Sequence, residues 1–227
     1  MAVKSQALTG DLWEALFPHA FTLMDEVRIH GGIEPFWTFG GGTVLMLRYQ
    51  HRLSHDIDLF VPDPQYLGYL TPRLSAAAES ITDQYIEQAN YVRLVLPSGE
   101  IDVVAATNLT AEPFELWEIM GREVRVETAA EIIAKKLYHR GYSGTARDLF
   151  DLAVVVEADP EGLSRAAPYL LRHADAFVER LKARPVLMRE QFAAIRRREY
   201  WKDFEQCLQI AEDFLMRLKR GHDGILR

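Results

Sequence analysis

The 227-residue chain is 48% hydrophobic and 26% charged with a formal net charge of −7, an ordinary globular composition, long enough for one large domain or two small ones. No apolar run is long enough for a membrane span, and the first residues lack the profile of a secretory signal, so we expect a cytoplasmic protein without a membrane partner. The single cysteine, Cys207, excludes an internal disulfide and a cysteine-based zinc site.

The first predicted element is an amphipathic helix that follows Asp11 and runs to about His30, with Pro18 as a point of interruption. Its apolar side chains recur at three- and four-residue spacing, which is typical of a helix that packs on a sheet. Asp11 is a suitable N-terminal cap, and Gly31 and Gly32 end the pattern. We assign this helix to the core and give it no chemistry.

A glycine run follows a short predicted strand. Residues 36–39 are aromatic and β-branched and lead into Gly40, Gly41 and Gly42, which can adopt positive φ and let a backbone approach a ligand closely. Thr43 and the apolar residues after it suit a short helix, whose N-terminus offers N–H groups and a positive dipole to a phosphate. A glycine run can also be only a turn, so this segment alone does not define a site.

Two aspartates stand thirteen and fifteen residues after Thr43. The run from Asp56 to Phe60 alternates polar and apolar residues, so a strand here places the Asp56 and Asp58 carboxylates on one face. Neighbouring carboxylates repel each other unless a hard cation lies between them, and Mg²⁺ is the expected cation. The alternative is a solvated strand edge.

The two patterns together resemble the nucleotidyltransferase superfamily of the DNA polymerase β type, in which Gly-Gly or Gly-Ser precedes Asp-x-Asp by about ten residues. They are more similar still to the AbiEii/AbiGii and MenT group of toxin nucleotidyltransferases, where Gly-Gly-Thr precedes Arg-x-Ser-x-Asp-Ile-Asp-Leu. The residues that match this pattern are Arg52, Ser54, Asp56, Ile57, Asp58 and Leu59. The resemblance implies that Asp56 and Asp58 hold metal, and that the nucleotide is bound by Gly41, Gly42, Thr43, Arg52 and Ser54.

Three strand-like runs then predict an antiparallel meander, over residues 84–88, 91–96 and 100–105. In the last run Asp102 stands among apolar residues, where a carboxylate is costly without a partner. In the resembling superfamily a third aspartate on a following strand completes the metal site, which makes Asp102 the candidate and Glu100 a weaker substitute. The alternative places Asp102 on a solvent-facing side of the sheet.

A predicted hairpin over residues 114–126 leads to two helices. Thr128 and Glu131 form a predicted capping box for the first, and the second begins near Ala146. The segment is similar to the toxin-family pattern Glu-x-x-x-x-Lys-Leu, a basic residue, and Arg-Asp-x-x-Asp-Leu. The residues that fill this pattern are Glu131, Lys136, Arg140, Arg147, Asp148 and Asp151.

The resemblance gives Lys136 a contact with the triphosphate, as a point charge that neutralises phosphate oxygens. Lys135 is the neighbouring alternative, which we expect to be solvated. Arg147 and Asp148 are candidates for nucleotide binding. With Asp151 they could instead form a salt-bridge network that joins the two helices, and both interpretations stay open.

From residue 159 onward the pattern is wholly helical, with predicted helices over residues 163–172, 175–183, 186–198 and 200–219. Residues 180–227 contain twelve Lys and Arg against seven Asp and Glu, a balance of +5 that leaves −12 for the first 179 residues. The run Arg196-Arg197-Arg198 with Tyr200 and Trp201 mixes cations and aromatic rings, as an RNA-contacting surface does. The same residues could instead form solvated faces or cover a bundle.

The sequence therefore predicts an α/β fold, with a nucleotidyltransferase-type mixed sheet and flanking helices followed by a C-terminal α-helical bundle. The predicted domains are residues 1–144, catalytic, and 145–227, helical. The predicted reaction is nucleotidyl transfer from an NTP to an acceptor hydroxyl, with two Mg²⁺ ions at Asp56, Asp58 and Asp102 and with Lys136 beside the leaving pyrophosphate.

By resemblance, the protein is the toxin of a toxin–antitoxin or phage-defence pair, its acceptor is a tRNA 3′ end, and a cognate antitoxin is a partner. Two alternatives stay open. The acceptor could be a small molecule or a protein side chain, or the chain could be a catalytically inactive binding module. The paired carboxylates argue against inactivity, because nothing physical favours retaining them without a cation.

Overall fold

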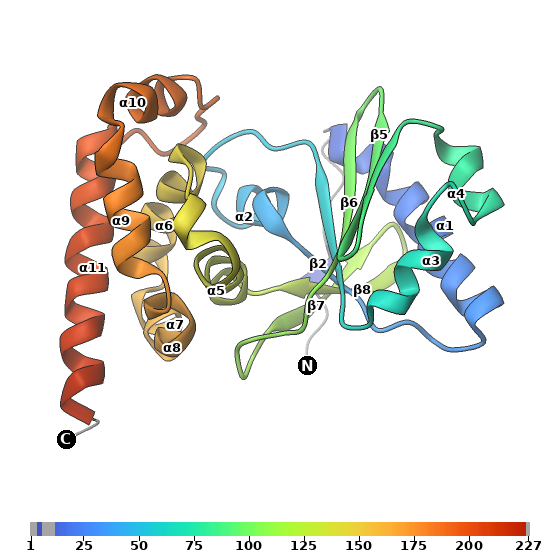
Figure 1. Ribbon diagram of the computed structural model, residues 1–227, viewed down its shortest axis with the longest axis horizontal. Helices are drawn as coiled ribbons and strands as arrows, with labels where there is room; N and C mark the ends of the chain where they lie inside the picture. Colours follow the sequence, from blue (N-terminus) through green and yellow to red (C-terminus); the bar gives the residue numbers. More distant parts are fainter. Residues whose placement is uncertain (1–3, 6–11, 226–227) are drawn as a thin grey trace. The chain divides into compact units, whose positions relative to one another are not determined.

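The computed structural model describes residues 4–5 and 12–225 (Figure 1). The chain forms two compact units. The first consists of Met1–Val44, Ser54–Asn108 and Phe114–Glu127, and the second of Leu45–Leu53, Leu109–Pro113 and Thr128–Arg227. The predicted domain boundary after residue 144 stays a prediction.

The first unit is built on a mixed eight-stranded sheet with the order β1-β7-β8-β2-β3-β6-β5-β4. Strand pairs β1–β7, β2–β8 and β3–β6 are parallel, and the other neighbours are antiparallel. The strands are β1 (Lys4–Ser5), β2 (Thr38–Gly40), β3 (Ile57–Val61), β4 (Tyr85–Gln88), β5 (Tyr91–Leu96), β6 (Gly99–Ala105), β7 (Phe114–Ile119) and β8 (Arg122–Glu127). The mixed sheet predicted from the sequence is confirmed.

One face of the sheet is apolar at its centre. Phe39, Leu59 and Val103 follow one another across β2, β3 and β6, and none of the three is exposed. Helix α1 (Leu12–Gly31) packs on this face, where Trp13 stacks on Phe39 with 6.2 Å between ring centroids. Because side chains alternate along a strand, the adjacent residues of the same strands lie on the opposite face, and these include two aspartates of the predicted site.

Helix α1 continues through Pro18, which lies in its interior. The helix loses the one hydrogen bond that this nitrogen would donate, while apolar residues on both sides of it stay buried. The predicted cap Asp11 lies outside the described residues. The remaining helices of this unit are η1 (Pro64–Tyr66), α3 (Leu67–Leu70) and α4 (Ala76–Ile81), of which α3 and α4 contact α1 (Figure 1).

The second unit is helical. Its helices are α5 (Ala129–Arg140), η2 (Gly141–Ser143), α6 (Ala146–Ala158), α7 (Pro160–Arg165), α8 (Ala167–Leu171), α9 (Ala174–Ala183), α10 (Pro185–Ala193) and α11 (Phe204–Ile225) (Figure 1). Helix α2 (Gly41–Tyr49) starts in the first unit and ends in the second. Helix α11 packs along α6 and α8, around a core that includes Phe150 and Phe177. Within residues 4–5 and 12–225, no helix is both long and apolar enough to cross a membrane.

The predicted capping box at Thr128 forms only in half. The Thr128 hydroxyl accepts a hydrogen bond from the Glu131 N–H, but the buried Glu131 carboxylate accepts from the N–H and hydroxyl of Thr110 instead of the cap backbone. A complete box stands at the start of α6, between Thr145 and Asp148. The prediction was wrong in this respect because the loop between β6 and β7 supplies other donors for Glu131.

The predicted helix over residues 186–198 is too long. Helix α10 ends at Ala193, and the backbone that follows pairs with the segment between α2 and β3. The Leu53 N–H donates to the Arg196 carbonyl at 2.8 Å, and the Arg198 N–H donates to the His51 carbonyl at 2.9 Å. The basic run is therefore extended rather than helical, and α11 begins only at Phe204.

Candidate active site

The glycine turn after β2 brings backbone and carboxylates into close contact. Gly41 has φ of +73°, which favours glycine, and a β-carbon there would overlap the Asp58 carboxylate. A β-carbon at Gly40 would overlap the carboxylate of Glu127. Glycine is therefore needed at both positions, because acidic side chains fill the space where a side chain would stand.

Thr43 fixes the start of the aspartate strand. Its buried hydroxyl donates to the backbone carbonyl of Asp56, thirteen residues further along the chain. The predicted contact between Thr43 and a phosphate is untested, and in the structure this hydroxyl serves the backbone. Gly42, the second residue of α2, is half-buried.

A row of polar residues crosses the face of the sheet opposite α1. Gly40 in β2 pairs with Asp58 in β3, Asp58 with Asp102 in β6, and Asp102 with Arg93 in β5. Paired residues on neighbouring strands point to the same face, so the side chains of Asp58, Asp102 and Arg93 stand side by side. The structure thus places Gly41 against Asp58 and Asp58 beside Asp102, and the role of these three residues in catalysis stays a prediction.

Arg93 is a member of this row that the sequence reading missed. Its Nε donates to Asp102 Oδ1 at 2.6 Å and its Nη2 donates to Asp102 Oδ2 at 2.7 Å, while Nη1 lies 3.1 Å from Glu100 Oε2. The hydrogen bonds to Asp102 raise the pKa of Arg93 above its ordinary value. The signal was present in the meander, since a short turn between adjacent strands places Arg93 opposite Asp102.

Asp56 lies just before β3 and is exposed. Its Oδ1 accepts a hydrogen bond from the Glu100 N–H at 3.0 Å, which ties the start of β3 to β6. Asp58 follows two residues later and is half-buried. Two accessible carboxylates at this spacing are hard oxygen donors that fit a divalent cation such as Mg²⁺. Among the described residues, no three His, Cys, Asp or Glu side chains converge closely enough to form a metal cluster.

Glu127 is a second residue that the motifs did not indicate. It ends β8, is fully buried, and accepts a hydrogen bond from the Thr38 hydroxyl at 2.7 Å. Its carboxylate lies beside Gly40, at the entrance to the glycine turn. Nothing in the local sequence distinguishes it from an ordinary exposed glutamate at a strand end.

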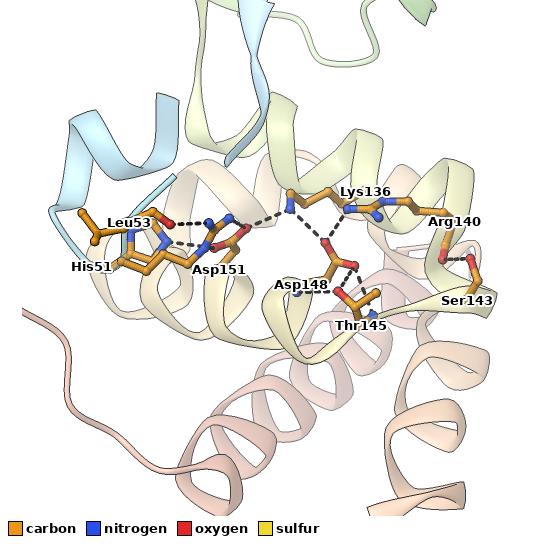
Figure 2. A network of polar contacts seen from close by, with 9 residues as sticks. His51, Leu53, Lys136, Arg140, Ser143, Thr145, Asp148 and Asp151 are labelled. Atoms are coloured by element: carbon orange, nitrogen blue, oxygen red, sulfur yellow. Dashed lines mark hydrogen bonds and ion pairs between the residues drawn. The ribbon is translucent and has the colours of Figure 1, made fainter. Parts of the chain in front are cut away.

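Within the second unit, a polar network joins five of the remaining motif residues, Arg52, Lys136, Arg140, Asp148 and Asp151 (Figure 2). Arg52 donates to both oxygens of Asp151, from Nε at 2.7 Å and from Nη2 at 2.9 Å. His51 Nε2 lies 2.8 Å from Asp151 Oδ1. Asp151 therefore anchors the short segment that precedes Ser54 to helix α6. Ser54 itself belongs to the first unit and is half-buried.

Lys136 lies at the centre of the network in Figure 2. Its Nζ donates to Asp148 and to Asp151, both at 2.8 Å, and Arg140 donates to Asp148 at 2.6 Å. Burial disfavours the charged form of Lys136, but the carboxylates of Asp148 and Asp151 outweigh it and raise the lysine pKa. Burial likewise opposes ionisation of Asp151, but the charges of Arg52 and Lys136 hold its pKa well below the usual range.

The salt-bridge interpretation of this segment thus describes Asp148 and Asp151, whereas Arg147 is exposed. Lys135 is buried and not solvated as expected, because its Nζ lies 3.4 Å from Glu131 Oε1 inside the unit. The roles of Lys136, Arg147 and Asp148 in nucleotide binding stay predictions.

The family model of the nucleotidyl transferase AbiEii toxin, type IV toxin–antitoxin system, matches residues 22–220. The chain therefore belongs to the AbiEii nucleotidyltransferase toxin family. Among curated proteins, none matches it.

Three solved structures resemble the chain over most of its length, at low similarity. A candidate nucleotidyltransferase from H. pylori has 15% identity and a TM-score of 0.45, covering 94% of this chain and 98% of its own. JHP933 from Helicobacter pylori has 15% identity and a TM-score of 0.43, covering 93% and 95%. An antigenic nucleotidyltransferase-like protein from Paracoccidioides brasiliensis has 16% identity and a TM-score of 0.41, covering 77% and 94%. The family assignment rests on the sequence match.

Proposed function

We propose that this protein transfers a nucleoside monophosphate from an NTP to an acceptor hydroxyl on RNA, as the toxin of a toxin–antitoxin pair. The observation that carries the proposal is the contact between the glycine turn and the aspartate strand, in which the Asp58 carboxylate occupies the space beside Gly41. A turn that must stay free of side chains, next to accessible carboxylates, suits a phosphate chain that is bound through a divalent cation.

In the proposed reaction the acceptor oxygen forms a bond to the α-phosphorus, and the bond from that phosphorus to the bridging oxygen breaks. Pyrophosphate leaves with the bonding electron pair, and the hydroxyl proton passes to solvent. Asp56 and Asp58 would hold Mg²⁺, which when bound would neutralise phosphate charge and activate the acceptor. The backbone N–H groups at the start of α2, at Gly42 and Thr43, would orient the β- and γ-phosphates.

The polar network of the second unit supports a role for Lys136 in binding the triphosphate. Arg52, Lys136 and Arg140 carry three positive charges against the two negative charges of Asp148 and Asp151. Lys136 keeps its positive charge inside this network, and a polyanion would be attracted to that charge. Lys136 would then offset charge on the leaving pyrophosphate, held in position by its two carboxylate partners.

The proposed RNA acceptor would contact those residues of the basic run that are exposed. Arg197 stacks on the Phe192 ring, with 4.9 Å from its Cζ to the ring centroid, and Arg198 donates to the Gln50 side chain at 2.6 Å. Arg196 and Trp201 remain exposed, Trp201 by 71%. An exposed cation and an exposed aromatic ring in one segment suit single-stranded RNA, whose bases stack while its phosphates attract the charge. The partner antitoxin is proposed from the family alone.

The test is to incubate the purified protein with each α-labelled NTP, Mg²⁺ and total tRNA, and to separate RNA from protein. We expect label in tRNA with the unmodified protein and none with Asp58→Asn. A matched control, Glu79→Gln, removes an exposed carboxylate on α4 and should leave labelling unchanged. Label in protein alone would indicate a protein-modifying transferase. Absence of label from both would reject RNA as the acceptor and favour a small-molecule acceptor or an inactive module.

A further inference from the structure

We propose that Arg93 acts as the counter-ion of Asp102 and keeps this carboxylate from binding a metal. The protein then holds one divalent cation, at Asp56 and Asp58, rather than two. The guanidinium then provides beside Asp102 the positive charge that a second ion would provide. This inference rests on the proposed nucleotidyl transfer for its purpose. The observation behind it is the pairing of Arg93 with Asp102 across the sheet.

The strand register brings Asp58, Asp102 and Arg93 into one row. Asp102 lies between Asp58 on one side and Arg93 on the other, in directly paired positions of β3, β6 and β5. All three side chains stand on the face opposite α1, so the order of charges across the sheet is negative, negative, positive. Register is fixed wherever one face of a sheet is buried, because a slip of one residue would turn the apolar residues outward. The position of Arg93 is therefore a property of the fold.

Arg93 forms a bidentate ion pair with Asp102. Both of its oxygens accept charge-assisted hydrogen bonds from Arg93, at 2.6 Å and 2.7 Å. The paired side chains are only 16% exposed for Asp102 and 35% for Arg93, so water screens them incompletely. A planar guanidinium fork matches a carboxylate in this bidentate manner and is always charged. A cation that used Asp102 would have to displace Arg93 or bind beside a permanent positive charge.

Arg93 also reduces the repulsion between Asp58 and Asp102. Asp58 and Asp102 are like charges in directly paired positions, an arrangement that destabilises a sheet unless a positive charge compensates it. Arg93 supplies this charge from the protein itself and also lies 3.1 Å from Glu100. The site is thus organised before any ion binds. Asp56, by contrast, is exposed and accepts from a backbone N–H, so a cation can reach it without breaking an ion pair.

The test counts bound Mn²⁺, a spectroscopic probe for Mg²⁺, in the full-length protein by the electron paramagnetic resonance signal of free Mn²⁺. We expect one Mn²⁺ per chain in the unmodified protein and loss of that ion in Asp58→Asn. The decisive variant is Asp102→Asn, which we expect to keep one ion with a Kd within tenfold of the unmodified value. Arg93→Gln should release Asp102 and raise the count to two.

Two bound ions in the unmodified protein, or a loss of affinity of tenfold or more in Asp102→Asn, would overturn the inference. So would a protein that binds no Mn²⁺. Circular dichroism shows whether Arg93→Gln is misfolded. If it is, the Mn²⁺ count of Asp102→Asn alone decides between one ion and two. In that variant the side-chain oxygen of asparagine can still accept a hydrogen bond from Arg93. Label transfer is read separately on the same preparations, so a protein with one ion and this variant pattern but no transfer would contradict the proposed function and leave the inference intact.

Discussion

At the scale of single residues, two glycines with the same backbone conformation allow a controlled test of the site. Gly41 has φ of +73° and Gly121, in the β7–β8 turn, has φ of +76°. A β-carbon at Gly121 would meet no atom within 4 Å, whereas one at Gly41 would overlap Asp58. Alanine at either position carries the same cost of a left-handed conformation, about 1 kcal/mol. Only the substitution at Gly41 also disturbs the carboxylate.

We therefore expect Gly41→Ala to abolish nucleotidyl transfer, with at least a hundredfold loss on the order of misplacement effects in other enzymes. Gly121→Ala should keep full activity and lose only the stability that the left-handed conformation costs, about 1 kcal/mol. Activity and urea unfolding of both variants provide the measurement. Equal activity in the two variants would show that the overlap with Asp58 has no role in the reaction.

The same scale shows why the candidate site was only partly predictable. Asp56 and Asp58 could be predicted as candidate metal ligands because they are two carboxylates only two residues apart in the sequence. Arg93 and Glu127 were missed because their positions depend on which strands are neighbours, and a single sequence does not give strand order. The Thr43 hydroxyl bonds the Asp56 carbonyl, thirteen residues away, a contact that the local pattern did not indicate, and the predicted contact of Thr43 with phosphate stays a prediction.

At the scale of elements, the strands were predicted better than the C-terminal helices. Alternation and turn residues gave the meander and the hairpin almost residue by residue, because these features are local. Helix α10 ends early because residues 196–199 pair with residues 50–53, a contact over almost 150 positions that no periodicity contains. In the same way, Glu131 binds the loop at Thr110 rather than completing its own cap.

The network around Asp151 joins α5, α6 and the segment before β3, so its removal should act on stability. Asp151 is fully buried and contacts Arg52, Lys136 and His51. Replacing it with asparagine leaves two buried cations with less compensation, and we expect a loss of about 3–5 kcal/mol in the free energy of unfolding. Asp83→Asn, at an exposed position, should change it by less than about 0.5 kcal/mol. Urea unfolding of both variants at neutral pH provides the comparison.

The depressed pKa of Asp151 also predicts the dependence on pH. The unfolded carboxyl takes up a proton near pH 3.9, whereas the folded one resists it, so the unfolded state binds more protons in acid. This contribution to stability is complete above the unfolded pKa and is lost as the pH falls through it toward the folded pKa. The free energy of unfolding should therefore fall more steeply below about pH 4 in the unmodified protein than in Asp151→Asn. Equal slopes would contradict the assignment.

At the scale of the whole molecule, the uneven charge of the chain favours its C-terminal part as the surface for the proposed RNA acceptor. The first 179 residues carry −12 and the remainder +5, so a polyanion is repelled by most of the sequence and attracted to its end. The fold removes part of this attraction, because Arg197 and Arg198 are committed to Phe192 and Gln50. Binding must then depend on the exposed members of the run, and each phosphate contact should show in the dependence of affinity on salt.

We expect Arg196→Ala to weaken binding of tRNA to the catalytically silent Asp58→Asn protein by about threefold to tenfold, and to reduce the slope of log affinity against log salt by about 0.7. Arg184→Ala removes an equally exposed positive charge outside the basic run and should leave both quantities unchanged. Arg197→Ala should instead lower the free energy of unfolding by about 1–2 kcal/mol, since it removes a cation–π contact inside the unit. Fluorescence anisotropy at four salt concentrations measures the slope. If Arg184→Ala and Arg196→Ala have the same effect, the attraction is a general property of the basic unit and the run at residue 196 is not its site.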